Sequence, residues 1–250
     1  NALTGSSDGD VILLTNGVYP RITDSTLVKT NLTWQSVNGP AVTIINAGGS
    51  DRAMYLSAGT LIGLTVCGVN GYWGGVLVAG NVTLTNCILR NNKTTACGPG
   101  GGLHVIDSGS ATLYNCRITD NSSANEGGGG IGISATASAA LYDCIVSGNV
   151  ALVSYGGGAS VLSGGKLNAT RTTFTHNRGS RGSAIYAAAQ YGASLTNCVI
   201  TYNDAGADQC TLYRCELNGC FVGGNAAQYQ PGGNGCLMQS CTLLRNYAYG

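Results

Sequence analysis

One short segment recurs along this chain, and its recurrence limits the possible folds more than any other feature. In most copies an apolar residue stands three positions before a Cys, and an Asn stands five positions after it, as in Leu84–Asn92. The clearest further copies begin at Leu113, Leu141 and Leu195. Successive Cys positions are 17 to 29 residues apart, with Thr172 in place of one Cys. Such a repeat, with variable glycine-rich insertions between copies, indicates a solenoid whose turns differ in length.

Each copy also alternates between apolar and polar residues. Cys116 and Ile118, for example, are separated by a polar residue and flanked by polar residues. A period of two indicates a β-strand whose Cys faces inward. The apolar residue three positions before the Cys breaks this period, which predicts a corner between the two. Helix-favouring residues are few and glycines number 40, so we predict an all-β fold with many turns.

We predict that residues 1–250 form one domain, a parallel β-helix of about eight or nine coils. Parallel strands of successive coils lie about 4.8 Å apart, which gives a rod about 40 Å long. Equivalent side chains then stack into ladders, and a stacked Asn can bond both the turn backbone and the next Asn. The predicted ladder residues are Cys67, Cys87, Cys116, Cys144, Cys198, Cys215, Cys241, Asn92, Asn121, Asn149, Asn177, Asn203 and Asn246.

Three further segments carry a family resemblance. Residues Asp8–Tyr19 have the pattern of an opening coil, and Phe174–Asn177 is followed by a second short motif at Gly182–Ile185. With these residues the chain resembles the right-handed parallel β-helices of the pectin-lyase-like superfamily. The motif pair resembles the repeats of polymorphic outer-membrane and adhesin passenger domains. The resemblance covers nearly the whole chain and implies a right-handed coil, the hand that parallel crossovers prefer.

Enzymes of that superfamily cleave acidic polysaccharides with clustered carboxylates, or with carboxylates that hold Ca²⁺ beside a basic residue. In this chain the carboxylates are dispersed. Asp8 and Asp10 fall in the expected opening turn, and Asp204 and Asp208 flank a glycine loop. Neither pair has the pattern of a catalytic or metal-binding cluster. We therefore expect no catalytic residue, no cofactor and no metal.

The remaining ionisable residues have structural interpretations. Asp143 and Arg171 fall on the same outward column of successive coils, which predicts a surface ion pair. His104 occupies an outward strand position, and His176 stands beside the Asn corner. Neither histidine has a partner at ligand spacing, so we expect both on the surface.

Eleven cysteines are present, but none forms the Cys-x₂-Cys pattern of a zinc site. Inside a stack they are expected to be mostly free thiols. Cys210 and Cys236 fall on equivalent positions one coil apart, so we favour them as a disulfide pair, and the odd total leaves at least one thiol unpaired or intermolecular. Tyr114, Tyr142 and Tyr213 each follow the inward Leu of a copy. This stripe is either a carbohydrate-binding surface or a packing ladder.

Composition narrows the functional classes. The net charge is +1 and charged residues make up 9% of the chain, so no basic surface for nucleic acid is expected. No apolar stretch is long enough to span a membrane. We predict a non-enzymatic structural or adhesive protein, extracellular or on a bacterial surface, with carbohydrate or a cell surface as further partners. Neither end has a predicted cap, so either the rod is part of a longer protein or its ends are covered by neighbours, and end-to-end contacts between copies would produce a filament. The alternative is a β-helix that binds or degrades polysaccharide.

Overall fold

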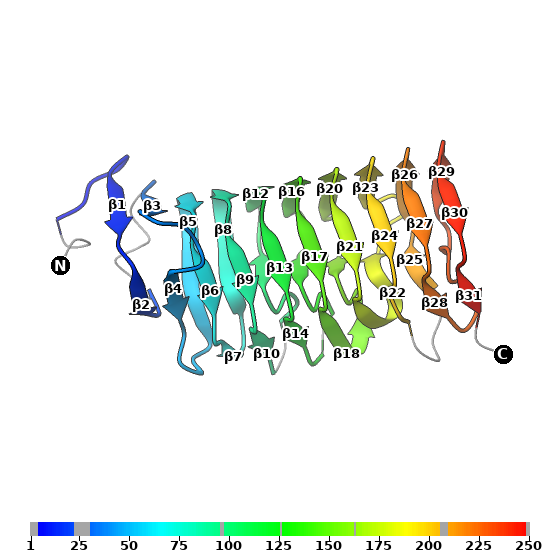
Figure 1. Cartoon of the computed structure of the whole chain (residues 1–250), viewed down its shortest axis with the longest axis horizontal. Helices are drawn as coiled ribbons and strands as arrows, with labels where there is room; N and C mark the ends of the chain where they lie inside the picture. The colour runs from blue at the N-terminus through cyan, green and yellow to red at the C-terminus, as the bar shows by residue number, and fades with distance from the viewer. Residues whose placement is uncertain are drawn as a thin grey trace.

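The computed structural model describes residues 5–22, 31–95, 98–125, 127–162, 164–205 and 210–248, without the side chain of Leu152. These residues form a rod of stacked coils, with the first and last strands at opposite ends (Figure 1). They contain strands and turns but no helix. Paired strands are parallel, and each pairs with its equivalent in the neighbouring coil. The predicted all-β parallel β-helix is confirmed, and Asp208 and Cys97 lie outside the described residues.

Ten short strands form a sheet that faces the viewer in Figure 1, which we call the front sheet. One strand comes from each passage of the chain; β2 and β4 precede the repeated copies, and the other eight belong to them. The strands are β2 (Gly17–Pro20), β4 (Thr43–Asn46), β6 (Thr65–Cys67), β9 (Ile88–Arg90), β13 (Arg117–Thr119), β17 (Ile145–Ser147), β21 (Thr173–Thr175), β24 (Val199–Thr201), β27 (Phe221–Gly223) and β30 (Thr242–Leu244).

A second sheet of nineteen strands wraps around the other sides of the rod. Its upper edge contains β1 (Val11–Leu14), β3 (Thr33–Ser36), β12 (Ser110–Tyr114), β16 (Ser138–Tyr142), β20 (Lys166–Thr170), β23 (Ala193–Thr196), β26 (Cys215–Asn218) and β29 (Leu237–Gln239). Its lower edge contains β7 (Asn70–Gly71), β10 (Lys93–Thr94), β14 (Ser122–Ser123) and β18 (Val150–Tyr155), beside the separate pair β28 (Ala226–Ala227) and β31 (Tyr247–Ala248).

The remaining strands form what we call the back face. They are β11 (Leu103–Val105), β15 (Ile131–Ile133), β19 (Ala159–Val161) and β25 (Cys210–Tyr213), together with parts of the long strands β5 (Arg52–Ile62), β8 (Gly74–Thr85) and β22 (Arg178–Ala187). Each long strand runs from the back face around an edge of the rod: β5 and β8 continue onto the upper edge, and β22 begins on the lower edge. The core lies between the front sheet and these faces and is filled by the inward residues of every coil.

Like residues lie over one another along the rod. Leu84, Leu113 and Leu141 are in register on successive coils, followed by Ala169 and Leu195. All five are buried. This register confirms the stacked coils predicted from the repeat.

Both corners of each front strand in the eight repeated copies are built by residues in the left-handed region. The residue before the Cys has a positive φ, 53° at Asn115 and 55° at Asp143, and so does the residue before the ladder Asn, 57° at Asp120. Asn and Asp tolerate this conformation better than most residues, which explains their frequency at these positions. The corner predicted between the apolar residue and the Cys is therefore confirmed.

Stacked asparagines line one of these corners. The backbone N–H and the side-chain amide of Asn121 both donate to Oδ1 of Asn149, each at 3.0 Å, and Asn149 donates in the same way to Asn177 at 3.1 and 3.0 Å. The Nδ2 of each also donates to a carbonyl of the front strand in the preceding coil, as Asn149 does to Ile118. The ladder is Asn92, Asn121, Asn149, Asn177, Asn203, Asn225 and Asn246.

Asn225 was not predicted, because the copy that contains it was assigned wrongly. Leu217 is in register with Leu195, so the true copy is Leu217–Asn225 and its Cys is Cys220, not Cys215. The segment that begins at Leu212 has the same Leu-x-x-Cys spacing, but it belongs to β25 on the back face. Two segments with Leu-x-x-Cys spacing, Leu212–Cys215 and Leu217–Cys220, thus lie within one short coil, and the wrong one was taken as the copy.

The Cys column is corrected accordingly. It consists of Cys87, Cys116, Cys144, Thr172, Cys198, Cys220 and Cys241. The backbone N–H of Cys87, Cys116 and Cys198 donates to the sulfur of the next coil, at 3.4 Å from Cys116 to Cys144, and that of Cys144 donates to the hydroxyl oxygen of Thr172. Cys215 stacks instead on Cys236, and Cys67 lies opposite Arg90 at the other end of a front strand. Leu64, fully buried, occupies the column position that was predicted for Cys67.

Glycine runs follow the Asn ladder because the chain packs tightly against it. A Cβ added at Gly130 would lie 2.9 Å from Cγ of Asn149 and 2.7 Å from the carbonyl oxygen of Gly158. A Cβ at Gly102 would meet the amide of Asn121 at 2.8 Å. Only glycine fits this close approach, and it lets the chain turn directly from the ladder onto the back face.

Candidate ligand-binding face

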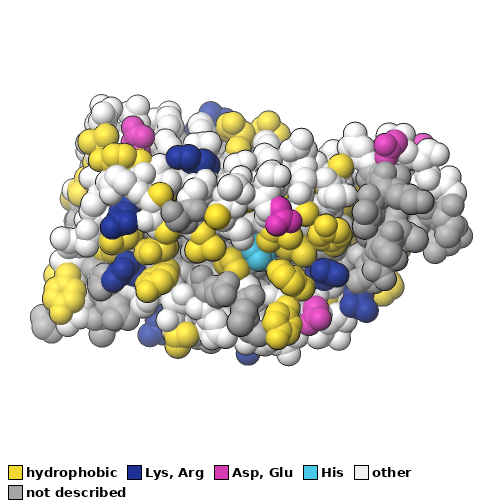
Figure 2. Space-filling view, turned by 180° about the vertical axis from the view of Figure 1, so that it is seen from behind, with side chains coloured by type: hydrophobic (Ala, Val, Ile, Leu, Met, Phe, Trp, Pro, Cys, Tyr) yellow, Lys and Arg dark blue, Asp and Glu magenta, His cyan; other side chains and the backbone are white. Residues whose placement is uncertain are grey.

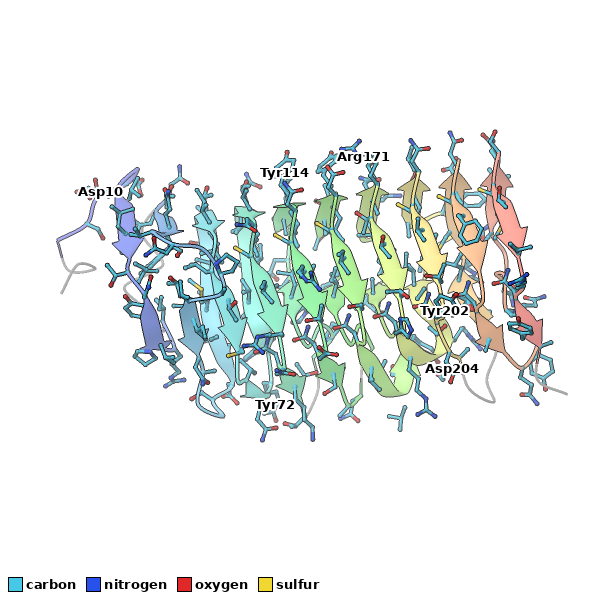
Figure 3. All side chains as sticks on the ribbon, viewed as in Figure 1. Asp10, Tyr72, Tyr114, Arg171, Tyr202 and Asp204 are labelled. Carbon is cyan, nitrogen blue, oxygen red and sulfur yellow. The ribbon has the colours of Figure 1, made fainter. Side chains whose placement is uncertain are left out.

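The predicted tyrosine stripe is divided between two surfaces. Tyr114 and Tyr142 stack with ring centroids 5.1 Å apart and planes at 14°, and the next residue in that column is Thr170. Tyr114 lies on the upper edge of the rod, as Arg171 does (Figure 3). Tyr213 is in β25 and stacks on Tyr186 of the back face. The prediction that Tyr213 shares the column is therefore wrong, for the same reason as the Cys215 assignment.

Cys210 and Cys236 do not form the favoured disulfide. The backbone of Cys210 forms an isolated parallel β-bridge with that of Gln230. The sulfur of Cys236 accepts a hydrogen bond from the backbone N–H of Cys215 at 3.4 Å. All ten described cysteines are free thiols. Burial raises the pKa of Cys210 to about 11, which leaves the thiol protonated at neutral pH. These thiols behave as small core residues.

The described carboxylates do not converge. Asp8 accepts from the backbone N–H of Asn31 at 2.9 Å and Asp10 from that of Ser7 at 2.7 Å, so both order the opening turn. Asp10 and Asp204 lie far apart on the rod (Figure 3). Within the described ranges no group of three potential metal ligands is present.

Asp143 and Arg171 form the predicted surface ion pair. The guanidinium Nε and Nη2 donate to the two carboxylate oxygens at 2.7 and 2.8 Å. Arg171 lowers the pKa of Asp143 by hydrogen bonding and charge, and both side chains are exposed. No other ion pair joins described residues.

The two histidines have different environments. His176 is exposed, as predicted, and stacks on Tyr202 with centroids 5.4 Å apart. His104 is only 3% exposed, so the prediction of a surface histidine is wrong there. Trp73, from the turn before β8, lies parallel to its ring with centroids 6.0 Å apart. An outward strand position is thus covered by a segment of the preceding coil.

His104 forms the floor of a shallow hollow of about 570 Å³ on the back face. Its Nε2 lies 3.2 Å from Oγ of Ser134, whereas its buried Nδ1 has no hydrogen-bond partner among the described residues. Burial lowers the pKa of His104 to about 4, so the ring is neutral at physiological pH. The other lining residues are Trp73, Pro99, Ile106, Asp107, Ala135, Thr136 and Leu162.

Further along the same face, three tyrosines and two arginines form what we call the arginine–tyrosine cluster. Tyr155, Tyr186 and Tyr213 stack with centroids 4.5 and 5.2 Å apart. The guanidinium carbon of Arg181 lies 5.4 Å from the ring centre of Tyr155 and 5.2 Å from that of Tyr213. That of Arg214 lies 5.0 Å from Tyr213, with one N–H bonded to a backbone carbonyl. Seen from behind, basic side chains lie among hydrophobic ones on this face (Figure 2).

Neither arginine of the cluster has a carboxylate partner within the described part of the chain, in contrast to Arg171. The Nε of Arg181 is also buried without an acceptor. Two positive charges held on aromatic rings, without a counter-charge from the described residues, favour an anionic ligand. The sequence signal for the cluster was weak, because its members come from three separate strands with no common spacing.

The chain is thus a parallel β-helix whose back face carries a hollow at His104 and the arginine–tyrosine cluster. The family model described as "Right handed beta helix region" matches residues 11–250, and the chain belongs to this family. No curated protein and no solved structure matches the chain. Among the described residues, no helix is long and apolar enough to cross a membrane.

Proposed function

We propose that this protein is a structural and adhesive β-helix of the bacterial surface or extracellular space, whose arginine–tyrosine cluster holds acidic carbohydrate in a role that involves no enzymatic step. The observation that carries the proposal is the placement of Arg181 and Arg214 on stacked tyrosine rings, with no carboxylate partner for either among the described residues. The resemblance of the motif pair to adhesin passenger domains agrees with this role.

The rod supplies rigidity for such a role. Neighbouring coils are bonded by parallel strands on several faces and, from Asn92 onward, by the asparagine ladder. A solenoid of this kind keeps a constant distance between its ends and presents its faces as extended surfaces. The protein would act as a stiff spacer with a ligand-binding side.

The cluster suits carboxylated sugars for two reasons. A guanidinium group can bond a carboxylate through two parallel N–H donors. The tyrosine faces largely cover one another, so only ring edges, hydroxyls and the free face of an end ring remain for a ligand. Tyr213 keeps its predicted role as a carbohydrate contact in this proposal, whereas Tyr114 and Tyr142 form a packing pair away from the cluster.

Binding to an immobilised acidic polysaccharide, polygalacturonate, and to neutral dextran tests the adhesive role. We expect binding to polygalacturonate alone, weakened by salt. Arg181→Gln and Arg214→Gln should each weaken it about tenfold, the loss expected for a hydrogen bond to a charged group. Arg117→Gln, an exposed arginine of the front sheet, is the matched control. Equal binding by all variants would contradict the proposal.

Polysaccharide degradation is the alternative function, and the absence of converging described carboxylates does not favour it. Incubation with the same polymers, followed by assays for unsaturated products and new reducing ends, tests it directly. End-to-end assembly stays a prediction. Electron microscopy of the purified chain supports it if filaments form and contradicts it if only single rods appear.

A further inference from the structure

His104 departs from the ladder pattern of the back face. Its column contains Leu77 in the preceding coil and Gly132 in the following one, so no neighbouring rung carries a similar side chain. The ring is nevertheless buried, with one nitrogen unbonded among described residues. A buried imidazole with an unbonded nitrogen costs stability, so its presence calls for an explanation.

Ser134 departs from its own column in the same place. It follows β15 at the position that Ile106 and Leu162 occupy in the adjacent coils, since all three amides donate to the last residue of the preceding back-face strand. A hydroxyl therefore stands between two apolar side chains, and it is bonded to His104 at 3.2 Å. Two separate breaks in the pattern thus produce one polar pair inside the hollow.

The turn that carries Ser134 also offers free backbone donors. The amide of Ala137 bonds the carbonyl of Ser134 and closes the turn. The amides of Ala135 and Thr136, by contrast, bond no described group, and both residues are exposed. A serine followed by two N–H groups that bond no described residue has the components needed to hold a negatively charged oxygen next to the nucleophile.

We propose that Ser134 is a nucleophile and His104 its base, in a site that reacts with small neutral acyl esters. The Ser134 Oγ attacks the ester carbonyl carbon while its proton passes to Nε2 of His104. The C–O bond to the alcohol then breaks, and the leaving oxygen takes that proton from Nε2. Water, activated by the same nitrogen, hydrolyses the acyl-serine and restores the hydroxyl.

The walls of the hollow indicate the substrate class. Trp73, Ile106 and Leu162 offer apolar surface for an acyl or aryl group. Asp107 is the one charged residue among the lining residues, and its carboxylate disfavours anionic esters. A neutral ester with a short acyl chain fits this combination. The site is independent of the proposed adhesive function, because it lies on different residues from the arginine–tyrosine cluster.

The surroundings of His104 also set its reactivity. Nε2 can accept the serine proton only when Nδ1 carries a hydrogen, and no described carboxylate bonds that nitrogen. Without this support the imidazolium is poorly stabilised, which agrees with a pKa lowered to about 4 by burial. We therefore expect a slow esterase that is captured well by activated reagents.

An alkyl fluorophosphonate tests the site, because Oγ–P bond formation with loss of fluoride leaves a permanent label on the serine. We expect mass spectrometry to find the label on Ser134, and 4-nitrophenyl acetate to be hydrolysed. Ser134→Ala should abolish both, and His104→Gln should slow both about 100-fold, the usual contribution of a general base. Ser110→Ala, on the upper edge, is the matched control and should change neither.

The pH profile of labelling separates this site from an ordinary reactive serine. Above pH 4 the ring is neutral and can accept the proton, so labelling of the wild-type protein should fall to half near pH 4 rather than near 6.5. This measurement needs no variant and remains valid if His104→Gln folds poorly. No label on Ser134, or equal labelling with and without His104, would overturn the proposal.

Discussion

The front sheet and the back face of the rod obey the same stacking rule, but to different degrees. On the front sheet β13 and β17 pair without offset, and buried side chains repeat from coil to coil. On the back face the outward column is mixed, with Leu77, His104, Gly132, Ser160 and Tyr186 on successive coils, and Trp73 stacks on His104. The comparison teaches that the regular ladder holds the rod together, while candidate chemistry collects where the ladder is broken.

The largest expected effect comes from breaking the regular ladder at its centre. Asn149→Leu keeps the volume but removes the acceptor of two Asn121 donors and two donors of its own. Several buried groups are then left unpaired, and we expect a loss of about 4 kcal/mol in the free energy of unfolding. Urea denaturation measures it.

Asn168→Leu, at an exposed position of β20, is the control for that experiment and should leave the unfolding midpoint nearly unchanged. Similar losses in both variants would show that the ladder contributes little beyond surface solvation, and the contrast between the two faces would then lose its energetic basis.

The next effect concerns the back face and depends on pH. The pKa of His104 is lowered from about 6.5 in the unfolded chain to about 4 in the fold, so the unfolded state binds more protons between these values. The free energy of unfolding therefore has its full value, as far as His104 is concerned, above pH 6.5. It decreases as the pH falls to 4, by about 3 kcal/mol in total.

Denaturation of wild type and two histidine variants at pH 7 and pH 4 isolates this contribution. His104→Gln should lose most of the pH dependence in that window, whereas His176→Gln should keep it, because His176 is exposed. If both variants keep the full dependence, the buried histidine does not limit stability in acid and the environment described for it is incorrect.

The sequence predicted the fold because every coil repeats the same inward residues, and repetition is visible without coordinates. It failed where two patterns competed in one short coil, so Cys215 and Tyr213 were placed in the wrong columns. It also failed at His104, because alternation tells which way a side chain points but not whether another coil covers it. The candidate sites depend on such covering segments, which explains why they were missed.

A smaller effect is expected where the glycine run meets the asparagine ladder. Gly130→Ala would place a methyl group 2.9 Å from Cγ of Asn149 and force the ladder and the glycine run apart. Overpacking of this kind costs about 2 kcal/mol, measured by urea denaturation. Gly5→Ala has open space around it and should be neutral. A neutral Gly130→Ala would mean that the glycine run does not pack closely on the ladder.

The smallest effect is expected at the ion pair of the upper edge. Arg171 lowers the pKa of Asp143, so the pair contributes stability above the unfolded carboxyl pKa and loses it as the pH falls through the folded value. Both side chains are exposed, however, and water and salt screen the attraction.

Asp143→Asn keeps a residue that tolerates the positive φ at this corner, so it removes the charge alone. We expect its urea midpoint at pH 7 to equal that of the wild type within error, in low and in physiological salt. A clear loss that vanishes in salt would instead show that surface charges couple neighbouring coils, and stability would not then come from the buried ladder alone.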